Sequence, residues 1–195
     1  MKNKILLGLS VIMMAALFMG CAKVPQTEID AANAALQSAI TAGADKYLPN
    51  DFAAVKDSLN AILEGIELQK SKTFPKYGDA PAKLANVTTM ANELVTKTEA
   101  RIAELKAEVP KKLEEVKALV TETKQLLLKA PRGKEGMAAL NAMKDEIATV
   151  ESSIGDVTTT LQSEVLAAST KVNGLLDKLN QIKKELQDAI AKVKR

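Results

Sequence analysis

The stretch Leu84–Val109, LANVTTMANELVTKTEARIAELKAEV, decides the fold class because its apolar residues recur at steps of three and four. This spacing places them on one face of an α-helix, where they form a seam that packs against neighbouring helices. The stretch therefore predicts one long amphipathic helix in an all-α protein. The seam consists of Leu84, Val87, Ala91, Leu94, Thr98, Ile102, Leu105 and Val109.

Two shorter apolar seams precede this stretch and predict two further helices. Residues 27–43 carry an alanine-rich seam, and residues 51–70 carry a stronger one. A side chain that caps a helix accepts a hydrogen bond from an unpaired N–H group in the first turn. We therefore expect Thr27 to cap the first helix, and Asn50 or Asp51 to cap the second.

The seam of the long helix continues past Pro110 to about residue 129, and after a turn containing proline and glycine another seam runs through residues 135–192. A single helix over this last segment would be about 85 Å long. We expect an elongated antiparallel helical bundle with long coiled-coil-like helices. In it the first two helices pack beside residues 80–109 and 159–192 to form a four-helix end, while residues 110–158 form a two-helix arm.

Pro110 and Gly155 are weak points in the two long segments. Proline removes a helical hydrogen bond, and glycine has a low helix propensity. If the chain turns back near Arg132, these two residues lie level with each other. We expect a shared bend or hinge at that height. The alternative is that both positions are breaks and that the C-terminal part consists of shorter helices.

The start of the chain has the organisation of an export signal. Lys2 and Lys4 precede an apolar run, and a small residue, Gly20, comes directly before Cys21. This pattern resembles the lipobox of bacterial lipoproteins, in which the signal is cut before a cysteine that carries acyl chains. The resemblance implies a signal peptide over residues 1–20, cleavage between Gly20 and Cys21, and lipidation of Cys21. An ordinary signal peptide with an incidental cysteine, or a short membrane anchor, is the alternative.

The chain after the signal peptide is expected to consist of a short linker and one helical domain. Residues 21–26 are expected to form a lipidated linker, and residues 27–195 a single elongated helical domain that changes character between Val109 and Pro110. Ala22, rather than aspartate, follows the cysteine. Among lipoproteins of Gram-negative bacteria this implies the outer membrane, with the protein on its periplasmic face.

Composition narrows the classes of function. Removal of residues 1–20 lowers the formal net charge from +3 to +1, which argues against nucleic-acid binding. The chain has no histidine and one cysteine, so the common zinc, haem and Ser-His sites are closed to it. Asp, Glu, Lys and Ser occur in no catalytic motif. We therefore expect no enzymatic activity, no cofactor and no metal.

Two groups of residues in turns are candidate contact sites. The aromatic residues Tyr47, Phe52, Phe74 and Tyr77 lie in or beside the turns that join neighbouring helices. They either line a binding patch or cover the ends of the core, and the two pairs should lie about 30 Å apart at opposite ends of one helix. Arg132 and Lys134 lie in an exposed turn that either contacts a partner or only reverses the chain.

A resemblance covers about residues 22–105. The stretches IDAANAALQSAITAGADKYLPNDFAAVKDSLNAILEGIE (residues 29–67) and YGDAPAKLANVTTMANELVTK (residues 77–97) resemble a family of uncharacterised, alanine-rich helical bacterial envelope lipoproteins. Some members of that family carry an OmpA-like peptidoglycan-binding domain afterwards, whereas this chain continues with coiled-coil-like helix. The resemblance implies a lipid-anchored envelope protein.

The leading functional hypothesis is a non-enzymatic spacer, scaffold or adaptor in the periplasm, held to the membrane by Cys21. Its other partner would be an envelope protein or the cell wall, and a homo-oligomer stays open. Two alternatives remain. The bundle could carry an apolar ligand between adaptable walls such as Met90, Met137 and Met143. The cationic C-terminus ending in Arg195 could be a peptidoglycan tether, although cations at a helix end are also favoured by the helix dipole.

Overall fold

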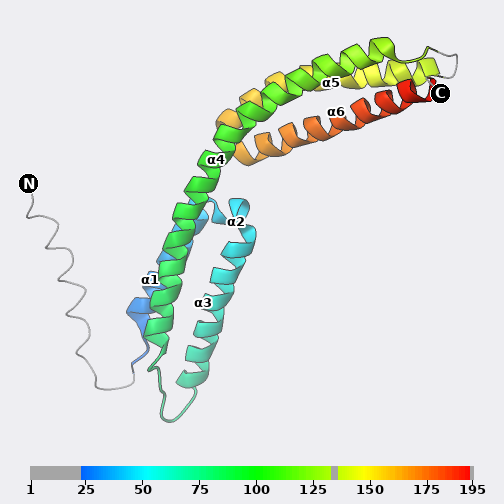
Figure 1. Ribbon diagram of the computed structural model, residues 1–195. Helices are drawn as coiled ribbons and strands as arrows, with labels where there is room; N and C mark the ends of the chain where they lie inside the picture. Colours follow the sequence, from blue (N-terminus) through cyan, green and yellow to red (C-terminus); the bar gives the residue numbers. More distant parts are fainter. Residues whose placement is uncertain (1–22, 133–135, 194–195) are drawn as a thin grey trace, which may run out of the picture. The chain divides into compact units, whose positions relative to one another are not determined.

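The computed structural model describes residues 23–132 and 136–193, which form α-helices joined by short turns (Figure 1). No strand occurs in these residues, and the predicted all-α helical bundle is confirmed. None of their helices combines the length and the apolar character that crossing a bilayer requires. The predictions made for Gly20, Cys21 and Lys134 lie outside the described residues. The helices are α1 (Gln26–Ala42), α2 (Ala44–Tyr47), α3 (Pro49–Lys70), α4 (Ala80–Lys129), α5 (Gly136–Ser163) and α6 (Val165–Val193).

The chain divides into two compact units, one ending at Val95 and the other beginning at Thr96. The division falls inside α4, so that each unit holds part of this helix. The sequence led us to expect one domain whose character changes at Pro110. The structure instead divides the chain earlier, because the side chains of α4 join two separate hydrophobic clusters.

The N-terminal unit is built by α1, α2, α3 and the first part of α4. Alanines dominate the buried face of α1, and their small side chains allow neighbouring helices to approach closely. Larger side chains from α3 and α4 fill the space between the helices, with Leu59, Leu84 and Leu94 almost fully buried. The cluster consists of Ile29, Ala32, Ala35, Ala39, Ala44, Val55, Leu59, Ile66, Tyr77, Ala80, Leu84, Val87, Ala91 and Leu94.

The starts of α1 and α3 differ from the predicted capped starts. Thr27 lies inside α1, which follows Pro25 without a side-chain cap. Asn50 and Asp51 lie inside α3, which begins at Pro49. Proline suits the first turn of a helix because its fixed φ is helical and its missing N–H has no partner there in any case. The proline therefore sets the start of α3, and the predicted caps are wrong.

Gly43 ends α1 where the sequence predicted. Its φ of 89° lies in the left-handed region, and its N–H donates to the carbonyl oxygen of Ile40 at 2.8 Å. Glycine adopts this conformation without the steric cost that a Cβ brings. A Cβ at this position would also lie 3.2 Å from the ring of Tyr47. The single turn of α2 follows directly, so the chain reverses between α1 and α3 over a few residues.

The C-terminal unit is built by the rest of α4 together with α5 and α6, which the core cluster joins. The expected 85 Å helix does not form, because the chain breaks at Glu164 and α6 packs back against α5. Ion pairs from Lys171 to Asp156 and from Lys178 to Glu146 join these two helices. The cluster consists of Val109, Leu113, Val116, Leu119, Val120, Ala130, Ile147, Val150, Val157, Ala168, Val172, Leu179, Ile182 and Leu186.

The expected four-helix end with a two-helix arm is therefore wrong. Each unit has its own core between three helix segments, with the single turn of α2 added in the N-terminal unit. The physical reason is the reversal at Glu164, which directs the apolar face of α6 towards α5 and the second part of α4.

Candidate functional site

The strongest candidate site is one end of the N-terminal unit, where the start of α1, the last turn of α3, residues 71–79 and the start of α4 meet (Figure 1). We call it the α3–α4 end. Tyr77 is buried there in the same cluster as Ile66 and Ala80, and Val24 packs against that cluster. The segment after α3 is therefore fixed to the core at Tyr77, next to the first described residues of the chain.

Gln69 holds the connecting segment on both sides of Phe74. Its backbone carbonyl accepts a hydrogen bond from the N–H of Lys72 at 3.0 Å, and its side-chain oxygen accepts one from the N–H of Lys76 at 3.3 Å. The hydroxyl of Ser71 donates to the carbonyl of Leu68 at 2.9 Å. These bonds give the segment a defined path over the end of the bundle.

Two apolar side chains project into solvent at this end. Phe74 is 82% exposed and Leu68 is 67% exposed, whereas Tyr77, three residues after Phe74, is 8% exposed. Covering the end of the core was one of the two interpretations of the aromatic residues. Tyr77 and Phe52 fit this interpretation, because Tyr77 is buried in the cluster and Phe52 packs against the same cluster from the start of α3. Phe74 does not, and it is left as an exposed aromatic ring.

The charges at this end are unevenly paired. Lys70 forms an ion pair with Glu67 at 2.6 Å, and Lys83 forms one with Asp79 at 2.6 Å. The hydrogen bond from Lys83 lowers the pKa of Asp79, and a backbone N–H and the charge of Lys83 add to this effect. Lys72 and Lys76 are exposed, and no carboxylate of the described residues lies within ion-pair distance of either. Two cations therefore flank Phe74 without a paired anion.

A hollow of about 390 Å³ lies beside this end, between α3 and the start of α4. Its lining mixes apolar groups such as Ile62 and Tyr77 with Gln69 and the ion-paired Lys83. Carriers of apolar ligands need walls that are predominantly apolar. Met90, Met137 and Met143, which the sequence offered as adaptable walls, do not line this hollow. The geometry therefore suggests a surface groove rather than a carrier site.

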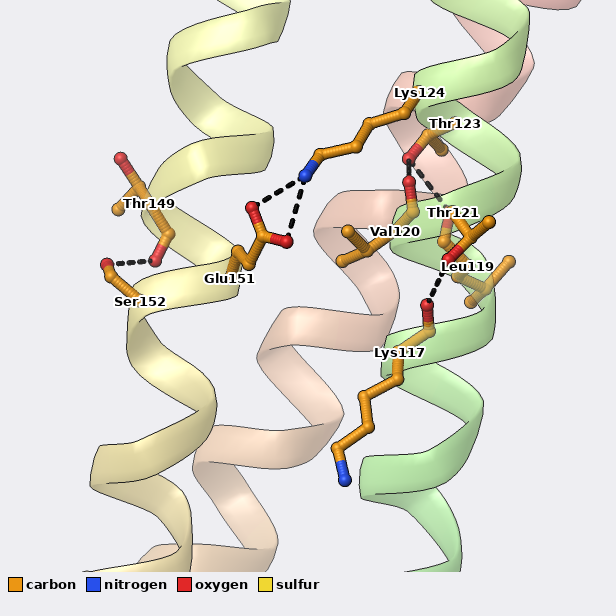
Figure 2. A network of polar contacts seen from close by, with 9 residues as sticks. All are labelled: Lys117, Leu119, Val120, Thr121, Thr123, Lys124, Thr149, Glu151 and Ser152. Carbon is orange, nitrogen blue, oxygen red and sulfur yellow. Dashed lines mark hydrogen bonds and ion pairs between the residues drawn. The ribbon is translucent and has the colours of Figure 1, made fainter.

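In the C-terminal unit, polar contacts join the helices rather than forming a site. Figure 2 shows Lys124 of α4 reaching across to Glu151 of α5, with its ammonium nitrogen 2.8 and 2.7 Å from the two carboxylate oxygens. Lys183 of α6 similarly approaches Glu122 of α4 at 2.8 Å. Both pairs are partly exposed, and pairs of this kind contribute little stability each. They help to set which helix faces lie together.

Buried Thr123 lies beside this bridge. Its hydroxyl oxygen is 2.8 Å from the carbonyl oxygen of Leu119 and 3.0 Å from that of Val120, so one hydroxyl hydrogen is shared between two acceptors of the same helix (Figure 2). A buried hydroxyl needs such a partner. The bond is local to α4, so Thr123 has no hydrogen-bond partner on another helix that would suggest a binding function.

The predicted hinge residues both lie inside helices. α4 continues through Pro110, and α5 continues through Gly155, so neither residue breaks its helix. Pro110 has no N–H to donate to the carbonyl of Lys106. Lys106 and Pro110 are both exposed, so water can take the place of the missing donor. The alternative of two breaks is wrong at these positions. The shared hinge is also wrong, because the ion pair between Lys124 and Glu151 places Gly155 level with about Val120 of α4 and not with Pro110. A bend at either residue alone stays a prediction.

The other predicted contact residues are spread over the two units. Tyr47 and Phe52 flank the start of α3, whereas Phe74 and Tyr77 follow its end, so the four aromatic residues do not form one patch. Arg132 is exposed in the turn after α4. The lysines that flank Phe74 were not singled out in the sequence, although three lysines and no carboxylate between Leu68 and Tyr77 were the available signal.

Residues 23–132 and 136–193 contain no group of three or more acidic, histidine or cysteine side chains that could hold a metal ion. No protein-family model, curated protein or solved structure matches this chain.

Proposed function

We propose that this protein is a bacterial envelope lipoprotein that acts as a spacer, scaffold or adaptor on the periplasmic face of the outer membrane. Acyl chains on Cys21 hold it to the membrane, and the helical units work through their shape and surface rather than through chemistry. The family resemblance of residues 22–105 points in the same direction.

The observation that carries this proposal is the short distance along the chain between the cysteine and the folded unit. The helix α1 begins at Gln26, five residues after Cys21. An extended chain of that length spans at most about 18 Å. An acyl anchor on Cys21 would therefore hold the α3–α4 end close to the lipid headgroups, as a spacer that starts at the membrane requires.

The anchor is tested by the intact mass of the protein after expression with its own signal in a Gram-negative host. The chain contains one cysteine, so a thioether-linked lipid can be carried only by Cys21. We expect a mature chain that begins at Cys21, with added lipid mass and partitioning into detergent. The matched Cys21→Ala variant should lose the lipid mass and the partitioning. An uncleaved chain or an unmodified soluble chain would contradict the proposal.

The adaptor role requires a second contact besides the anchor. Arg132 is the exposed residue of the described part that the sequence singled out for it. A photo-crosslinking residue placed at Arg132 should capture a defined envelope protein or wall fragment in cells. The same residue at Lys184, an exposed cation of α6, serves as the control. Equal capture from both positions, or none from either, would count against a specific contact at the turn.

A further inference from the structure

We propose that the α3–α4 end is a membrane-docking surface for anionic phospholipid, with Phe74 in the lipid interface and Lys72 and Lys76 against the headgroups. The proposal deepens the function given above and rests on it for the proximity of this end to the membrane. It specifies which face of the protein lies on the membrane and how the N-terminal unit is oriented there. An acyl anchor at the end of a linker fixes neither.

The start of the described chain lies at the same end of the unit as the segment that carries Phe74. The described chain begins at Lys23, and Figure 1 shows the start of α1 at the same end of the unit as the segment between α3 and α4. Val24 packs against the cluster that contains Tyr77. The residues next to the proposed anchor are thereby fixed to the core close to the segment that carries Phe74. A lipid on Cys21 and the ring of Phe74 can consequently reach the same surface.

The apolar part of the surface is the second argument. Phe74 is 82% exposed and lies between two segments that Gln69 holds through its backbone and side-chain oxygens. The backbone on both sides of Phe74 is therefore held, and the exposed ring has a defined position on the unit. Aromatic rings at the ends of membrane-associated elements lie at the level of the headgroups, and apolar side chains there add to binding. Leu68, 67% exposed in the last turn of α3, is a second exposed apolar side chain at this end.

Charge complementarity is the third argument. Between Leu68 and Tyr77 the chain has three lysines and no carboxylate, although its mature part as a whole is almost neutral. Lys70 is paired with Glu67, which leaves Lys72 and Lys76 beside Phe74. A lysine near an anionic membrane surface contributes about 1 kcal/mol of binding, or about a fivefold change in partitioning. The local excess of positive charge therefore suits an anionic lipid surface better than an apolar protein face.

The test of docking uses the absence of tryptophan from the chain. Phe74→Trp places a single reporter at the proposed contact, and Ile40→Trp places the control near the other end of α1, where the native side chain is also exposed. The full chain is expressed with its signal, and the lipidated protein is reconstituted into vesicles of phosphatidylcholine and phosphatidylglycerol. We expect emission from position 74 to shift to shorter wavelength and to be quenched by brominated acyl chains, while emission from position 40 stays unquenched.

Three outcomes would overturn the proposal. Emission from position 74 could stay that of a water-exposed ring in anchored protein. Both positions could be quenched equally, which would mean unspecific adsorption. The shift at position 74 could instead follow protein concentration in solution without vesicles, which would identify a second copy of the chain as the occupant of this surface.

A second measurement separates docking from anchoring. The chain from Ala22 onward contains every residue that the structure describes and cannot be lipidated. It should co-sediment with phosphatidylglycerol-containing vesicles more than with pure phosphatidylcholine vesicles. The double variant Lys72→Gln, Lys76→Gln should lower this partitioning about 25-fold, from about fivefold for each lysine.

The matched control for the double variant is Lys46→Gln, Lys56→Gln, which removes two exposed lysines elsewhere in the N-terminal unit and should change little. Equal binding to both kinds of vesicle, or equal loss in both double variants, would refute the headgroup contact. Neither result depends on Cys21, so failure of docking and failure of the proposed lipid anchor are distinguishable.

Discussion

Replacing Thr123 by valine should leave the C-terminal unit as stable as before or make it more stable. Thr123 is completely buried, but its hydroxyl bonds only to the carbonyl oxygens of Leu119 and Val120 in the same helix. In an α-helix these two carbonyls also accept the backbone N–H groups four residues further on. Removing the hydroxyl therefore leaves no buried acceptor without a partner.

The magnitude follows from two opposing terms. Losing the hydroxyl bond costs on the order of 1 kcal/mol at most, and less where the acceptors are already satisfied, because such local bonds compete with the helix itself. The added methyl group contributes about 0.8 kcal/mol of burial. Threonine and valine have similar helix propensities, so that contribution cancels. The two terms nearly cancel, and we expect the free energy of unfolding to change by between about −0.2 and about +0.8 kcal/mol.

The assay is urea unfolding followed by far-ultraviolet circular dichroism. The control is Thr121→Val, because the exposed hydroxyl of Thr121 makes the same kind of bond to the carbonyl of Lys117 at 3.1 Å (Figure 2). That variant should stay within about 0.5 kcal/mol of the native chain. Thr123→Ala should lose about 1 kcal/mol through the space it leaves. A loss above about 1 kcal/mol in Thr123→Val alone would refute the reasoning and show that the hydroxyl has a larger structural role.

Three further predictions concern the cores, a turn and an ion pair. Leu84→Ala and Leu186→Ala, each fully buried in a different unit, should each lower the free energy of unfolding by about 2–5 kcal/mol and shift only the urea transition of their own unit; a common shift would contradict the separate cores. Gly43→Ala should lower the melting temperature through a cost of about 1–2 kcal/mol because of its positive φ, whereas Gly65→Ala, which meets no neighbouring atom within 4 Å, should raise it. Lys124→Ala should cost at most about 1 kcal/mol in urea unfolding, and less in 1 M salt.

The faces of the helices could be predicted from the sequence because burial follows the three-four spacing closely. Leu84, Leu94 and Leu105 of the opening stretch are all buried, as their spacing predicts. Helix starts were less predictable. The rule that favours Ser, Thr, Asn and Asp competes with the rule that favours proline in the first turn, and here Pro49 determined the start of α3.

The reversal at Glu164 could not be predicted from the apolar spacing. The turn between α5 and α6 leaves only Glu164 outside both helices, so the apolar seam remains in step across it and resembles that of one continuous helix. The composition did indicate a weak region, because the side chains of serine and threonine compete with the helix for backbone hydrogen bonds. In the structure the hydroxyls of Thr158, Thr159 and Ser163 each donate to a carbonyl of their own helix. The predicted weak point was Gly155, and the chain turns after the threonine run instead.

The candidate site shows the same limit at the level of single side chains. Phe74 and Tyr77 lie in one segment with proline and glycine, and the sequence gives no periodic pattern there that would separate a buried ring from an exposed one. Their difference arises from the path of the backbone, which Gln69 holds from the end of α3. The flanking lysines are visible in the sequence, but their relation to Phe74 and to the start of α1 exists only in the folded unit.

Phe74 also shows why stability and membrane contact are separable at this end. Burying a phenylalanine ring would contribute about 1.5–3 kcal/mol to folding, and the N-terminal unit forgoes most of this because Tyr77 already covers the end of the core. The same burial free energy can be gained when the ring of Phe74 enters an apolar environment outside the protein. At the end where α1 begins, the environment that our proposal supplies is the lipid interface, and the lysines beside the ring restrict that contact to an anionic surface.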